Sequence, residues 1–122
     1  MVLESGHSVN WLGVPRFAPY DVAMFCGTLE CDLLLPGDAR SLKTKRSYVR
    51  PVIASLRKYE VAVAEVGHLD RHGRTSVGIA AVAADHRHVS QLLDSCEHHL
   101  NGRPEVEILS ITRRIIGPED FE

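Results

Sequence analysis

An α+β fold is predicted by the order in which two kinds of apolar pattern alternate along the 122-residue chain. Four segments have the alternating or β-branched patterns of strands. Two segments repeat apolar residues every three or four positions, as core-facing helices do. The elements follow in the order β-α-β-β-α-β, which is the split βαβ plan of ferredoxin-like domains. We therefore expect one four-stranded antiparallel sheet with two helices on one face.

The first strand is predicted over residues 23–35, because the sequence AMFCGTLECDLLL alternates between two faces. One face is apolar and consists of Phe25, Gly27, Leu29, Cys31, Leu33 and Leu35. The other, wetter face holds Cys26, Thr28, Glu30 and Asp32. Its two carboxylates could also face Arg113 or Arg114 of the fourth strand. The turn sequence Pro36-Gly37-Asp38 ends the strand.

The first helix is predicted to begin after Ser41, whose hydroxyl can cap the first turn. Its apolar stripe consists of Leu42, Val49, Val52, Ile53 and Leu56. Pro51 lies inside this pattern and lacks a backbone N–H, so we expect one helix with a bend. The alternative is a basic turn up to Arg50, followed by a helix whose first residue is Pro51.

The remaining elements follow from similar patterns. Residues 61–69 and 75–84 read as a β-hairpin joined by a polar connection that contains Gly73. A second helix starts at the cap Asp85, carries Val89, Leu92, Leu93, Cys96 and Leu100 at helical spacing, and ends at Asn101-Gly102. Residues 105–116 form the fourth strand. Two right-handed crossovers place the first and third strands in the centre of the sheet.

The length fits one domain, which we expect over residues 23–117. Residues 1–22 show neither period and are expected to be an extension, disordered or partly docked through Trp11, Phe17 or Tyr20. Residues 118–122 are expected to be a C-terminal tail. Three scattered cysteines indicate a reducing cytoplasm, and no apolar run is long enough for a bilayer. We expect a cytoplasmic protein with no membrane association.

The first helix carries the concentrated positive charge of a chain whose net charge is −2. We predict a nucleic-acid-binding flank there, consisting of Lys43, Lys45, Arg46, Arg50 and Arg57. Cations on one flank beside a helix N-terminus attract phosphate groups. The alternative is that these side chains only keep the helix surface solvated.

The sequence contains no recognisable catalytic motif, phosphate loop or metal-ligand spacing. We expect no enzyme, no catalytic residue, no metal site and no small-molecule cofactor. An enzyme that uses Glu65, His68 or Cys26 is a weaker alternative, because spacing alone does not bring these residues into one cleft. RNA recognition on the open sheet face is not expected, since that face offers Thr28 and two carboxylates in place of stacking aromatic residues.

Two segments resemble the YlxP-like family, the bacterial domain-of-unknown-function family 503. One consists of Pro36, Gly37, Ser41, Leu42, Lys43, Lys45 and Arg46, and the other is VAEVG at residues 63–67. The resemblance covers about residues 24–117 and implies a ferredoxin-like fold. Genes of that family tend to lie among translation and ribosome-maturation genes, which implies a role with RNA by association.

We therefore expect a small binding protein that contacts RNA or a ribosomal particle through the basic flank of the first helix. The alternative comes from a different class of function. It is a homodimeric or protein-partner-binding module that uses the open sheet face or an edge strand and has no nucleic-acid role.

Overall fold

The computed structural model describes residues 23–121, so the expected extension at residues 1–22 lies outside the described residues. The elements are β1 (Phe25–Leu34), α1 (Leu42–Arg57), β2 (Ala62–Gly67), β3 (Arg74–Ala83), α2 (His86–Asn101), β4 (Glu107–Ile116) and the 3-10 helix η1 (Pro118–Phe121). This order confirms the predicted βαββαβ plan. Neither α-helix of this region is long and apolar enough to cross a membrane.

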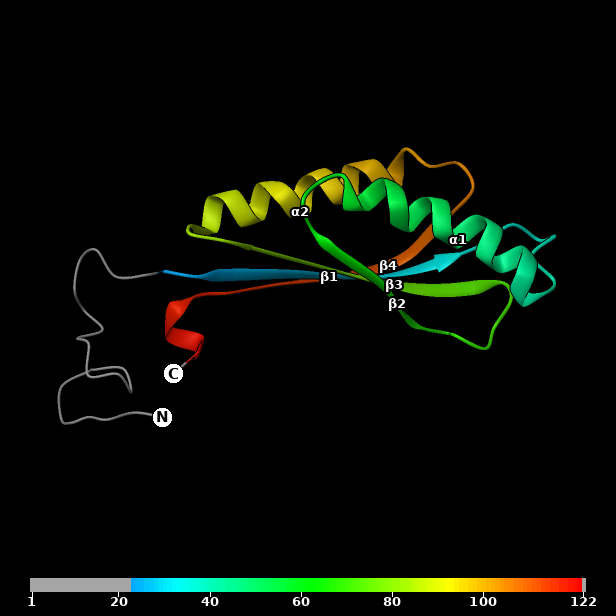
Figure 1. Ribbon diagram of the computed structural model, residues 1–122, viewed down its shortest axis with the longest axis horizontal. Coiled ribbons are helices and arrows are strands. Elements are labelled where there is room, and N and C mark those ends of the chain that lie inside the picture. Colours follow the sequence, from blue (N-terminus) through cyan, green and yellow to red (C-terminus); the bar gives the residue numbers. More distant parts are fainter. Residues whose placement is uncertain (1–22, 122) are drawn as a thin grey trace.

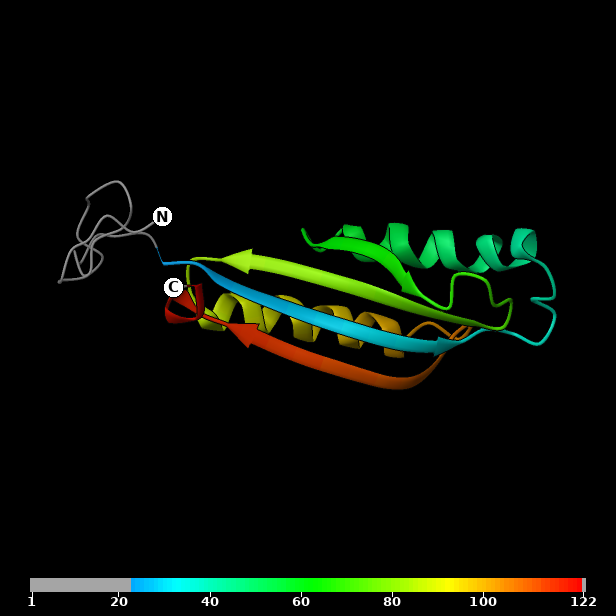
Figure 2. The same cartoon turned by 90° about the horizontal axis from the view of Figure 1, so that it is seen from below.

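The four strands form one sheet in the order β2-β3-β1-β4, and all neighbours are antiparallel. The first and third strands are central and the second and fourth are the edges, as predicted. Figure 2 shows this order from the side of the sheet that the helices leave open. We call that side the open face.

Both helices lie on the other face of the sheet (Figure 1). Helix α2 packs against β1, β3 and β4, while α1 packs against β2 and α2. The predicted apolar face of β1 is the core side, since Leu29, Cys31 and Leu33 have no exposed surface. Gly27 permits close packing, because a Cβ atom there would lie only 2.8 Å from Leu93 Cδ1. The core therefore lies between the sheet and the helical layer.

Helix α1 begins as predicted, because the backbone N–H of Thr44 donates to Ser41 Oγ at 3.0 Å. Pro51 lies inside one continuous helix, so the alternative start at Pro51 is wrong. Val52 and Leu56 are buried, but Leu42 is 40% exposed and does not belong to the core. The buried position in that first turn and a half is Lys45 instead.

Arg113 ties β4 to α2. Its Nη1 atom lies 2.9 Å from Asp94 Oδ1 and 2.8 Å from Glu97 Oε2, and Nη2 donates to Ser90 Oγ at 2.8 Å. The expectation that Arg113 could face the carboxylates of the open face is therefore wrong. Successive side chains of a strand point to opposite faces of the sheet, so Arg114 lies on the open face.

Candidate nucleic-acid interface

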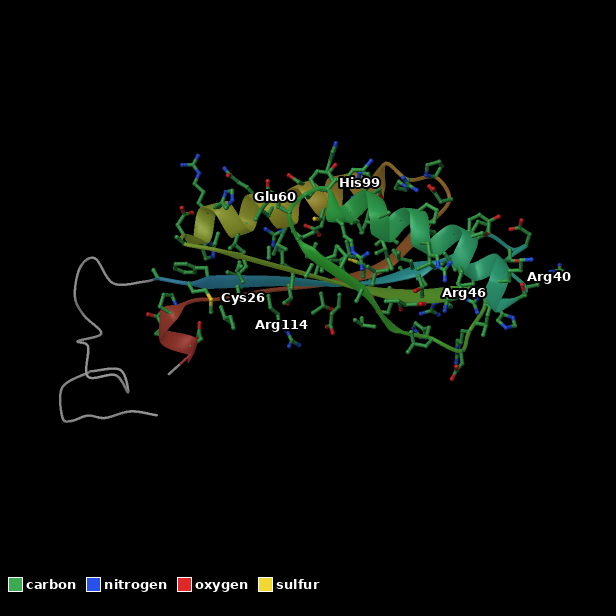
Figure 3. All side chains as sticks on the ribbon, in the orientation of Figure 1. Cys26, Arg40, Arg46, Glu60, His99 and Arg114 are labelled. Atoms are coloured by element: carbon green, nitrogen blue, oxygen red, sulfur yellow. The ribbon has the colours of Figure 1, made fainter. Side chains whose placement is uncertain are left out.

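Three of the predicted cations line one shallow hollow on the exposed side of α1. They are Lys43, Arg46 and Arg50, which together with Ser47 enclose about 520 Å³. All three side chains are exposed, and none forms an ion pair with any residue between 23 and 121. Figure 3 shows Arg46 toward the end of α1 that lies beside the β2–β3 connection. We call these three residues the α1 basic surface.

Lys45 is placed differently from its neighbours, and its predicted role in nucleic-acid binding needs correction. Only 3% of the residue is exposed. Its Nζ atom lies 2.8 Å from Glu65 Oε2 and donates to the backbone carbonyl of His68 at 2.6 Å. A buried ammonium that is already paired cannot reach a phosphate group outside the fold. Lys45 therefore holds α1 onto β2.

Regular alternation along β2 places the carboxylate that Lys45 needs, and a bulge follows it. Glu65 pairs with Val77 and Gly67 pairs with Ser76, so Val66 is the additional residue between them. Because Val77 faces the core, Glu65 lies on the helical side of the sheet. Its Oε2 atom also accepts a hydrogen bond from the Thr75 hydroxyl at 2.6 Å.

His68 connects this buried pair to the open face. Its carbonyl accepts from Lys45, while its Nε2 atom lies 3.4 Å from Asp32 Oδ1. Asp32 also accepts a hydrogen bond from Arg74 Nη2 at 2.5 Å. The backbone of His68 has φ 57°, a left-handed conformation that is uncommon outside glycine. These contacts fix where the β2–β3 connection leaves the sheet.

A second hollow, of about 380 Å³, lies between α1 and this connection. It is lined by Leu42, Lys45, Arg46, Val49, Arg50, Ile53, Glu65 and Leu69, and we call it the α1–hairpin hollow. Arg46 and Arg50 border both hollows. Sequence reasoning missed this hollow, although Leu69 and Glu65 belong to segments that it identified.

Arg57 does not join the α1 basic surface. It is exposed, but its Nη2 atom donates to the backbone carbonyl of Val63 at 3.0 Å. It also lies seven residues after Arg50, about 10 Å further along the helix axis. The cluster of exposed, unpaired cations is therefore smaller than the predicted set, and it lies in the first half of α1.

The charge on α1 opposes the stability of the helix. The first turn contains no acidic residue but holds Lys43 and Lys45, and Arg46 follows directly. Cations near a helix N-terminus face the positive end of the helix dipole, which typically costs about 0.3–1 kcal/mol for each exposed charge. Helix stability therefore does not explain these residues. Their charges add to the positive end of the dipole and create a local attraction for anions.

The residues of the enzyme alternative do not share one site. Glu65 faces the helical layer and the His68 ring faces Asp32. Cys26 lies six residues before Asp32 on β1, about 20 Å away along the strand. Burial raises the pKa of the Cys31 thiol to about 12, with help from Glu97 and Cys96, and burial also raises the pKa of Cys96. These two thiols are poor nucleophiles.

The fold and this surface together define a ferredoxin-like domain whose helical layer carries exposed basic residues. The chain belongs to the DUF503 family, described as a protein of unknown function, whose sequence model matches residues 26–113. The resemblance predicted from the sequence is thereby confirmed. A relative from Bacillus subtilis strain 168, "Uncharacterized protein YlxP", is 34% identical over 88 residues. That match covers 71% of this chain and 94% of the relative.

Replacing Lys45 by methionine tests its structural role. The Glu65 carboxylate would lose its cation and His68 would lose a hydrogen-bond donor, so we expect a loss of about 1–3 kcal/mol in the free energy of unfolding. Arg46→Met is the matched control, and it should change stability by less than about 0.5 kcal/mol. Urea titration measures both. Equal effects of the two substitutions would contradict the assignment.

His99 links the two helices at the other end of α1. Its Nδ1 atom lies 3.2 Å from the Tyr59 hydroxyl oxygen, and its Nε2 atom lies 2.8 Å from Ser55 Oγ. A neutral imidazole has one donor and one acceptor, which two hydroxyl groups can match. A protonated ring has two donors and no acceptor, so it can no longer accept a hydrogen bond from either hydroxyl group.

The pKa of His99 predicts how stability depends on pH. Burial lowers this pKa below 6.5, nearby Arg103 and Lys58 lower it further, and Glu105 opposes them. Because the unfolded chain binds the proton more tightly, stability should fall as pH drops from 6.5 through the lower folded-state value. Thermal melts across this range should show a smaller fall for His99→Gln than for the wild type. Identical pH profiles would contradict the prediction.

Proposed function

We propose that this chain is a non-enzymatic cytoplasmic protein that binds structured RNA or a ribosomal particle through the α1 basic surface. The observation that carries the proposal is the shared hollow of Lys43, Arg46 and Arg50, exposed and without carboxylate partners among the described residues. Three cations around one hollow can neutralise neighbouring phosphates of a nucleic-acid backbone. The unfavourable position of Lys43 in the first turn of the helix supports a role outside folding.

The distribution of charge also supports the helical side as the binding side. The chain as a whole has a net charge of −2, so attraction to a polyanion depends on local asymmetry. On the open face, Glu30 is exposed on β1 and the neighbouring positions of β2 and β3 are alanine and glycine. That face has no aromatic platform for bases along these three strands. RNA contact is therefore favoured at α1.

Reversing the α1 basic surface tests the proposal. We expect wild-type affinity for ribosomal RNA to fall with salt, with a log–log slope of about −2 to −3 for three neutralised phosphates. The variant Lys43→Glu, Arg46→Glu, Arg50→Glu should lose this binding while its melting temperature does not fall. Filter binding at several salt concentrations measures the slope.

The control must distinguish an effect of the α1 basic surface from an effect of the change in net charge. Arg87 is an exposed residue at the start of α2 and has no ion pair in residues 23–121, so Arg87→Glu makes the same charge change as Arg46→Glu. Only Arg46→Glu should weaken binding strongly. Salt-independent binding, or equal loss in the two single variants, would refute the proposed interface.

A second candidate function is homodimerisation through the open face. A shallow hollow of about 380 Å³ crosses this face above β1, β2 and β3. Its floor is small and apolar, with Ala62, Ala64, Gly78 and Ala80. Nearby Val82 is 63% exposed. An apolar sheet face of this kind is a typical interface in small α+β modules.

The charges on the open face favour a second copy as the partner. Glu30 lies on β1 and Arg114 on β4, and no ion pair joins either of them to a residue of the described chain. Figure 3 shows Arg114 projecting away from the helices. A two-fold axis through this face would place Glu30 of one protomer opposite Arg114 of its partner. An isologous interface requires such self-complementarity.

A charge swap tests the dimer. Arg114→Glu should weaken association roughly tenfold or more, because like charges would face each other across the interface. Adding Glu30→Arg to the same chain should restore association. Sedimentation analysis over a concentration series measures both. A wild-type chain that stays monomeric at high concentration would exclude this candidate.

A further inference from the structure

The α1–hairpin hollow has a different chemistry from the basic surface beside it. Leu42 and Leu69 are 40% and 58% exposed, and they line its wall with the partly buried Ile53. Its volume of about 380 Å³ is within the range of small-ligand pockets. Exposed leucines that line a concave site are available to pack against an apolar ligand surface.

The hollow also contains a polar pair that can recognise a ligand edge. Glu65 lines the hollow and is partly exposed, and its Oε2 atom is used by Lys45 and Thr75. No described residue donates a hydrogen bond to its Oε1 atom, which leaves an acceptor there. Lys45 is buried and engaged by His68 and Glu65, so it holds the carboxylate in place. An unused acceptor therefore lies between apolar walls.

We propose that the α1–hairpin hollow receives one unpaired nucleobase of the strand whose phosphates lie on the α1 basic surface. This inference rests on the proposed function. A nucleobase has apolar faces for Leu42 and Leu69 and an edge whose N–H donors can bond to the free oxygen of Glu65. Arg46 and Arg50 border both hollows, so they can hold the phosphates on either side of the inserted base.

This arrangement selects single-stranded RNA. In a duplex, the partner strand already occupies the base edge and stacking holds the base inside the helix. An unpaired base in a loop or at a strand end can turn outward at much lower cost. The ligand class is therefore an RNA segment with an exposed base, and A-form duplex RNA should bind less well despite its higher charge density.

Removing the exposed wall tests the inference without disturbing the core. We expect Leu69→Ala to lower affinity for a single-stranded oligoadenylate by about three- to tenfold, because the base loses apolar contact. The salt slope should stay unchanged, since no phosphate contact is lost. Val82→Ala, which truncates an exposed residue on the open face, is the matched control and should have no effect.

The same titration includes two other strands of equal length. A sugar-phosphate strand without bases should bind wild-type protein about tenfold more weakly than the oligoadenylate. Leu69→Ala should reduce that difference. A duplex should bind the wild type and Leu69→Ala equally.

The outcomes separate the two proposals. If abasic and base-bearing strands bind equally well with a steep salt dependence, or if Leu69→Ala has wild-type affinity, the base pocket is wrong and phosphate binding by the α1 basic surface stands. If the wild type binds none of the three strands, both proposals fail.

Discussion

The ion pair between Lys45 and Glu65 is the contact on which this end of the molecule depends. It joins the start of α1 to the end of β2, and the same ammonium group holds the carbonyl of His68. A charge with 3% exposure is costly unless it is paired and hydrogen-bonded. Its position therefore fixes the rotation of α1 about its own axis. With Lys45 directed inward, Lys43 and Arg46 must point outward.

This division of charge explains how one helix can serve both the fold and a binding surface. The buried side of α1 consists of Lys45, Val49, Val52 and Leu56, spaced by three and four residues. Positions on the opposite side place their cations in solvent, where a polyanion can reach them. The bulge in β2 brings the hairpin connection against α1, and this contact forms the hollow that Leu69 lines. The regular part of β2 thus positions the ion pair, and the bulge after it precedes the connection that lines the candidate site.

The architecture could be predicted from the sequence because its signals are local. Apolar alternation in β1, the Ser41 and Asp85 caps, and the spacing in α2 each mark an element without reference to the rest of the chain. The burial of Lys45 could also have been inferred, since it lies four residues before Val49 on the buried stripe. Residue type favours the surface for a lysine, whereas helical spacing predicts Leu42 on the apolar stripe.

The remainder of the site depends on contacts that are distant in sequence. Lys45 meets Glu65 only when α1 packs on β2, and nothing in VAEVG indicates that Val66 is an extra residue. The sequence pattern predicts Leu69 as the last residue of the second strand, whereas β2 ends at Gly67, so the pattern does not indicate a pocket wall. Arg113 and Arg114 are adjacent, and strand alternation alone does not decide which of them faces α2. Each of these placements depends on how the strands pair and how the helices pack on the sheet.

We propose that the helical layer near the start of α1, and not the open face, meets a polyanion. Hydrogen–deuterium exchange of the full chain, with and without ribosomal RNA at low salt, tests it directly. We expect slower exchange in residues 42–50 and 68–73 when RNA is present, with residues 26–32 and 112–116 unchanged. Protection confined to those strand residues, or no protection in either region, would contradict it.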